Sequence, residues 1–231
     1  MKCVTIGEKH SYNDFKLLLT SKVISPPSPK LNLLSVPLRD GSIDLTEVLT
    51  DEVKYADRKI TMEFTMLGTS KSWPERISEI QNYLHGQRLK IVFDDDAAFY
   101  YIGRISVNEW ISDKVAGKIV IEGSVDPFKY DMQSSAVDWE WDTFDFNQGI
   151  INEMGELIVN GSTTVTLICR KKRMFPTFTA SADMKVTFDG ETHDLKIGSQ
   201  KVYGIFLCEG ENELTFTGNG TVAIEYIGGS L

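Results

Sequence analysis

The residues best suited to bind a ligand are two tryptophans, Trp139 and Trp141, which alternate with acidic residues. If both rings are exposed and coplanar, they form a platform on which a sugar can stack. The same alternation is typical of a strand that turns its aromatic side chains into a core and its acids toward solvent. We favour the core interpretation and keep carbohydrate stacking on Trp139 and Trp141 as the alternative.

Two runs of like charge are further candidates. Asp94, Asp95 and Asp96 could ligate a divalent cation, but consecutive acids in a short hairpin are more typical of a solvated turn. The run RKKR at residues 170–173 could contact an acidic partner or DNA. In a chain of net charge -9, a single run indicates an exposed loop, because nucleic-acid binding needs many clustered cations. We therefore expect no specific binding of nucleic acid.

No combination of residues suggests catalysis. The chain has no G-x-S-x-G, P-loop or G-x-G-x-x-G sequence. Its histidines and cysteines are far apart and lack the spacing of metal ligands: His10, His85 and His193, and Cys3, Cys169 and Cys208. We expect reduced, buried thiols in a protein made in cytoplasm. The prediction is a protein that is not an enzyme, with no catalytic residues, metal site or cofactor.

The sequence also lacks signals for export or membrane insertion. The N-terminal residues contain no apolar core of a signal peptide, and no long uncharged apolar run occurs elsewhere. Residues 160–162 and 219–221 match the glycosylation sequon. Without a signal peptide, we interpret both as Asn-Gly turns.

The first half of the chain predicts a β-rich domain with one helix. Ile60, Met62, Phe64 and Met66 alternate with polar residues, which indicates a strand with one buried face. Ser72 and Glu75 form a capping pair, Gly86 is a natural stop, and four apolar residues lie between them at helical spacing: Trp73, Ile77, Ile80 and Leu84. Residues 25–40, which precede the strand with Ile60 to Met66, are rich in proline. They predict an extended connection that ends in a turn at Asp40-Gly41.

After the helix, alternation predicts strands at residues 89–93, 99–105, 105–111 and 118–125. The second half contains only short strand patterns, at residues 137–146, 163–169, 184–188, 192–197, 202–208, 213–216 and 222–227. Turn residues separate them, which is typical of an all-β sandwich or jelly roll. The fold class predicted is mainly β, with domains at residues 1–130 and 131–231. Proteolysis near residues 131–135 is expected to leave two folded fragments.

Five motifs occur in an order that resembles the siphophage-type distal tail proteins, the ring-forming adaptors at the tip of a phage tail. The strings, in order, are PLRDGSIDL at residues 37–45, YADRKITMEF at 55–64, the helix ending in LHG at 84–86, DD followed by YYIG at 94–103, and DPFKY at 126–130. The C-terminal string GENELTFTGNGTVAIEY at 210–226 is similar to the close of that family's galectin-like β-sandwich. The large insertion of some longer relatives is absent.

The resemblance implies a structural role at the virion tail tip, with assembly in the host cytoplasm. Residues 1–130 would form a homo-hexameric ring that joins the tail-tube protein to the tail-associated hub protein. Residues 131–231 would project outward toward receptor-binding or peripheral tail proteins. The proline-rich segment offers an arm that can lie against a neighbouring copy. The alternative function is a carbohydrate-binding module for adhesion to the host surface.

Overall fold

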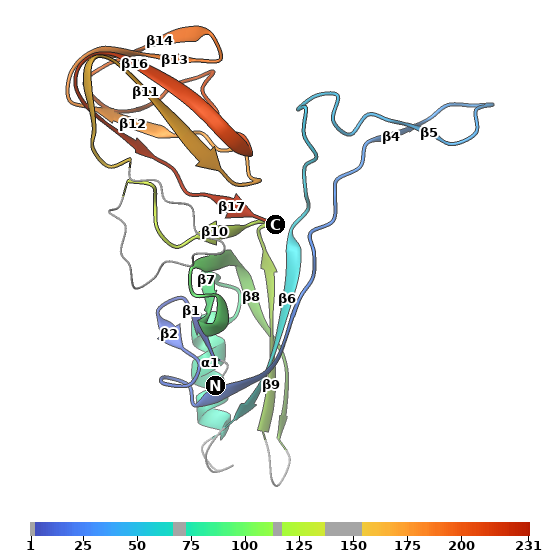
Figure 1. The fold of residues 1–231 in the computed structure, drawn as a ribbon. Coiled ribbons are helices and arrows are strands. Elements are labelled where there is room, and N and C mark those ends of the chain that lie inside the picture. The colour runs from blue at the N-terminus through green and yellow to red at the C-terminus, as the bar shows by residue number, and fades with distance from the viewer. Residues whose placement is uncertain (1–2, 67–72, 113–116, 137–153) are drawn as a thin grey trace. The chain divides into compact units, whose positions relative to one another are not determined.

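The computed structural model describes residues 3–66, 73–112, 117–136 and 154–231. It divides into two compact units (Figure 1). Unit 1 comprises Met1–Asp95 and Tyr101–Pro127, and unit 2 comprises Asp96–Tyr100 and Phe128–Leu231. No helix among these residues is long and apolar enough to cross a membrane.

Unit 1 is built on one antiparallel sheet, in the order β2-β1-β7-β8-β9-β6-β3. Its strands are β1 (Val4–Ile6), β2 (Lys9–His10), β3 (Leu17–Ile24), β6 (Arg58–Met66), β7 (Arg88–Phe93), β8 (Phe99–Ser112) and β9 (Gly117–Val125). The sequence pattern had suggested a break near residue 105, but β8 runs through it as one strand. At Gly103 an added Cβ would lie 2.2 Å from the carbonyl oxygen of Ser124, so only glycine allows β8 and β9 to approach this closely.

One helix, α1 (Trp73–Leu84), covers one face of this sheet (Figure 1). Its four buried residues are the predicted ones, Trp73, Ile77, Ile80 and Leu84. They share a core with the buried face of β6, whose alternation is also as predicted. The capping residue Ser72 lies outside the described residues. Gly86 ends the helix with a φ of 78°, a conformation that glycine adopts without steric cost.

Unit 2 contains eight described strands, of which six form an antiparallel sheet around a second core and two short ones pair with each other and with β8. They are β10 (Lys129–Asp131), β11 (Leu157–Cys169), β12 (Thr177–Ala180), β13 (Met184–Phe188), β14 (Glu191–Leu195), β15 (Gly198–Lys201), β16 (Gly210–Glu225) and β17 (Gly229–Ser230). The mainly β prediction with a single helix is thus confirmed for the described residues. The strand predicted at residues 137–146 lies outside them.

The long antiparallel pair of β11 and β16 corrects the Asn-Gly turn prediction. Asn160 pairs with Asn219, and Gly161 pairs with Gly218, so both sequons lie inside paired strands. Gly218 and Gly220 have φ of 150° and 147°, and Gly161 has 75°. These glycines therefore allow the paired strands to bend, and the chain does not reverse there. As a result, β16 pairs with β13 on one side of the bend and with β12 on the other.

Two other strand predictions in unit 2 are wrong. The expected strand at residues 202–208 contains only an isolated bridge from Leu207 to Met174, whereas β15 lies just before it. The two expected strands at 213–216 and 222–227 are one, because β16 continues through the bend. The turn at Asp189-Gly190, by contrast, forms as predicted, with φ of 49° and 79° in a two-residue hairpin loop.

Candidate functional site: an exposed arm

The most exposed part of unit 1 is the segment between β3 and β6, residues 25–57, which we call the arm. Its two halves run beside each other (Figure 1). Backbone hydrogen bonds join them at the base: Ser25 N–H donates to the Lys59 carbonyl (2.9 Å), and Lys30 N–H donates to the Lys54 carbonyl (2.7 Å). The proline-rich stretch is extended, as expected. The arm is a defined structural element, because its two halves are paired.

Farther out, the arm forms a two-stranded hairpin of β4 (Leu33–Ser35) and β5 (Ser42–Asp44). Gly41, in the predicted turn, has a φ of 73°, which suits glycine. Asp44 holds the chain after β5, since its carboxylate accepts a hydrogen bond from Thr46 N–H at 2.9 Å. Hydrogen bonds from Thr46 lower the pKa of the Asp44 carboxyl. Sequence reasoning found the turn but missed both strands.

The arm carries apolar side chains that are about half exposed or more. Leu33 and Leu34 are neighbours on β4 and therefore point to opposite faces of the hairpin, yet they are 52% and 49% exposed. Four further apolar residues of the arm are also exposed: Leu31, Leu38, Val48 and Leu49. An isolated two-stranded hairpin is at best marginally stable in water, and exposed apolar patches mark interaction sites. The arm is therefore suited to contact another protein surface.

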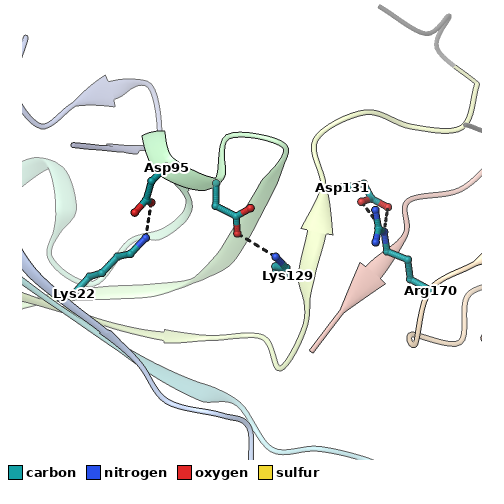
Figure 2. Close-up of polar contacts among 6 residues, drawn as sticks. Lys22, Asp95, Lys129, Asp131 and Arg170 are labelled. Atoms are coloured by element: carbon teal, nitrogen blue, oxygen red, sulfur yellow. Dashed lines mark hydrogen bonds and ion pairs between the residues drawn. The ribbon is translucent and has the colours of Figure 1, made fainter. Parts of the chain in front are cut away.

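The acidic run at Asp94–Asp96 forms a short 3₁₀ helix, η2 (Asp94–Asp96). Each carboxylate has its own cationic or imidazole partner: Asp94 lies 3.3 Å from His10 Nε2, Asp95 lies 2.5 Å from Lys22 Nζ, and Asp96 lies 3.1 Å from Lys129 Nζ. Figure 2 shows the two lysine pairs. The three carboxylates thus have three separate partners. They do not form a plain solvated turn, and they do not converge on one point.

The Cys3 thiol also approaches His10 and Asp94, and the three ligand atoms lie within 4.8 Å of one another. The hydrogen bonds of His10 oppose metal binding there. Asn13 N–H donates to His10 Nδ1 at 3.2 Å, so in the neutral ring Nε2 carries the proton and donates to Asp94. A metal on Nε2 would require the proton on Nδ1 and would break the contact with Asn13. Hydrogen bonding thus accounts for the positions of the His10 and Asp94 side chains.

The basic run at residues 170–173 is a loop, but its side chains are held within unit 2. Arg170 pairs with Asp131, and Lys171 pairs with Glu209. The ammonium of Lys172 lies 4.4 Å from the ring centroid of Tyr130, and the guanidinium of Arg173 lies 4.3 Å from that of Phe206. All four side chains of the run thus have contacts within unit 2. Few of its charged groups remain available to bind an acidic partner or DNA.

The remaining sequence candidates give no chemical site in the described residues. Trp139 and Trp141 lie outside them, so the carbohydrate alternative stays a prediction. Cys3 and Cys169 are buried free thiols, as expected, and Cys208 is partly exposed. Burial raises the pKa of the Cys169 thiol to about 11, which opposes formation of a nucleophilic thiolate.

A depression on the sheet of unit 1 includes Lys59, Arg104 and Glu122. Lys59 pairs with Glu122 at 2.7 Å, and Arg104 donates to the Gly86 carbonyl at 2.5 Å. These three charged groups are thus engaged with one another or with backbone, as on an ordinary solvated sheet face.

Comparison with known proteins found no matching family model and no matching curated protein. Among solved structures, the chain is similar to the Dit protein (gp 19.1) of SPP1, whose crystal structure is described as a paradigm of the hub adsorption apparatus in phages that infect Gram-positive bacteria. The two are 15% identical, with a TM-score of 0.64, and the match covers 98% of this chain and 99% of that one. At this identity, the likeness shows that the chain has a Dit-like fold.

Proposed function

We propose that the chain is a structural component of a phage tail tip, without enzymatic activity. The observation that carries the proposal is the Dit-like fold over nearly the whole length of both chains. The five sequence motifs that resemble distal tail proteins support it independently of the fold. The protein is then located in the virion tail and is assembled in the host cytoplasm.

Within this role, unit 1 is the ring-forming part. Six copies close into a ring through heterologous contacts, which generate rings when the rotation between copies closes. The arm is the contact that we assign to a second copy, because its leucines are exposed to an extent that apolar residues of a core are not. The ring joins the tail-tube protein to the tail-associated hub protein, and unit 2 is available to receptor-binding or peripheral tail proteins.

The arm can be tested directly by a double substitution, Leu33→Ser with Leu34→Ser. Both side chains are about half exposed, so we expect the melting temperature to change little, as for most surface substitutions. Self-association of the wild-type chain at high concentration, measured by sedimentation velocity, should weaken by about tenfold or more, because apolar contact area is lost on both faces of the hairpin.

Ile158→Ser is the matched control, because Ile158 is 70% exposed but lies in β11 of unit 2. This variant should associate like the wild type. Association that is indifferent to the arm substitutions, or equally sensitive to Ile158→Ser, would show that the arm is not the contact between copies.

A further inference from the structure

Unit 2 is not continuous in the sequence, because it includes the five residues Asp96–Tyr100 that precede most of β8. We infer that this segment is an anchor without which the ladder of β10 and β17 in unit 2 does not form. Sequence reasoning had placed an independent domain at residues 131–231, and such a fragment lacks the anchor altogether. The inference rests on contacts within unit 2 and does not depend on the proposed function.

The anchor takes part in a small ladder. Phe99 pairs with Asp131 and Tyr100 pairs with Tyr130, so the anchor is the strand next to β10. On its other side β10 pairs with β17, near the C-terminus. Met132 N–H also donates to the Ala98 carbonyl at 2.9 Å. Removing the anchor would leave one side of β10 unpaired, and an isolated pair of such short strands is only marginally stable.

Aromatic and cationic side chains of unit 2 contact the anchor. The Phe99 ring is 3% exposed, and two cations lie near it: Lys129 Nζ at 3.9 Å and the Arg170 guanidinium at 5.0 Å from the ring centroid. The Tyr100 ring stacks on Tyr130 with centroids 5.4 Å apart. A cut at residue 128 or 131 would therefore expose the Phe99 and Tyr100 sites in unit 2.

The cations that contact Phe99 are themselves held by carboxylates (Figure 2). Lys129 pairs with Asp96 at 3.1 Å, and Arg170 Nε lies 3.0 and 3.2 Å from the two oxygens of Asp131. Burial raises the pKa of the Asp131 carboxyl even though Arg170 beside it acts in the opposite direction. Loss of Phe99 would leave these partly buried ion pairs without the ring that covers them, and partly buried charges are costly when their surroundings open.

Asp95 and Asp96 provide a matched pair for the test. They are consecutive residues of η2, with side chains 41% and 33% exposed, but Asp95 pairs with Lys22 of unit 1 and Asp96 pairs with Lys129 of unit 2. Asp95→Asn and Asp96→Asn make the same chemical change one residue apart. Their effects should therefore appear in different units.

The experiment is native-state hydrogen exchange on the full chain, read by mass spectrometry for each strand. In Phe99→Ala, we expect exchange in β10, β17 and β16 to accelerate by tenfold or more, while β6 and α1 keep their wild-type rates. Asp96→Asn should accelerate exchange in β10 and β17 by a smaller factor. Asp95→Asn should leave unit 2 unchanged.

Wild-type exchange throughout unit 2 in both Phe99→Ala and Asp96→Asn would overturn the inference. If Phe99→Ala does not fold at all, Asp96→Asn decides, since it removes one charge and keeps the ring. Equal acceleration of hydrogen exchange in unit 2 by Asp95→Asn and Asp96→Asn would also contradict the inference. The effect would then not depend on whether the substituted aspartate pairs with Lys129 of unit 2.

Discussion

Replacing Ile80 with alanine should lower the free energy of unfolding by about 2–5 kcal/mol, the usual range for truncating a buried isoleucine. Ile80 has no exposed surface and lies in the middle of the apolar face of α1. It packs in the same core as β6 and β9, so the truncation leaves a cavity under the only helix of the described chain. Urea unfolding followed by circular dichroism measures the change.

Asn82→Ala is the control for this substitution. Asn82 lies on the exposed face of the same helix, where alanine is at least as good a helix former. Its stability should match the wild type within about 0.5 kcal/mol. If the two variants unfold at the same urea concentration, α1 does not contribute to the core as described.

In unit 2, we expect Asn212→Ala to cost about 2–5 kcal/mol, since several partly buried groups lose their partners, at about 1–3 kcal/mol for each group that is left without one. The Asn212 side chain is 6% exposed and holds the chain before β16. Its amide oxygen accepts from Cys208 N–H at 2.9 Å, and its NH₂ donates to the carbonyls of Cys208 at 2.8 Å and Gly210 at 3.1 Å. Thermal unfolding of unit 2 measures the loss.

Asn212→Asp sharpens the test because it keeps the shape and the acceptor but removes the donors. A carboxylate facing the Cys208 and Gly210 carbonyls is repelled, so this variant should be at least as unstable as alanine at neutral pH. Glu213→Gln, an exposed neighbour on β16, should be neutral. Wild-type stability of Asn212→Asp would show that the amide donors are dispensable.

The sequence pattern correctly predicted those elements of the fold in which buried residues recur at one regular spacing. The strand β6 and the helix α1 have one buried face each, so alternation and helical spacing identified both elements and their core residues. The turn at Asp189-Gly190 was likewise predictable, because two positive φ angles in succession need that chemistry. In these segments, local preference and tertiary structure agree.

The bend in β16 was not predictable from the same rules. Gly218-Asn219-Gly220 has the composition of a turn, but its three residues pair with Gly161, Asn160 and Val159 of β11, so the ladder continues through it. The anchor was hidden for another reason. Asp96–Tyr100 reads as the start of a strand in the first half, and only long-range pairing with β10 assigns it to unit 2.

The candidate site was visible in the sequence only in outline. Prolines and Asp40-Gly41 identified an extended arm, but exposure of its leucines depends on tertiary structure that no local pattern encodes. The charge runs at residues 94–96 and 170–173 were ambiguous for the same reason. Their partners, among them Lys22, Lys129 and Asp131, are distant in sequence.

The central claim is that this chain closes into a ring at a phage tail tip. It is tested most directly by mixing the chain with a tail-tube protein and a tail-associated hub protein. Native mass spectrometry and cryo-electron microscopy of that mixture should show a closed particle containing six copies of the chain. The Leu33→Ser/Leu34→Ser variant should fail to form it while remaining folded. A chain that stays monomeric with both partners present would contradict the account.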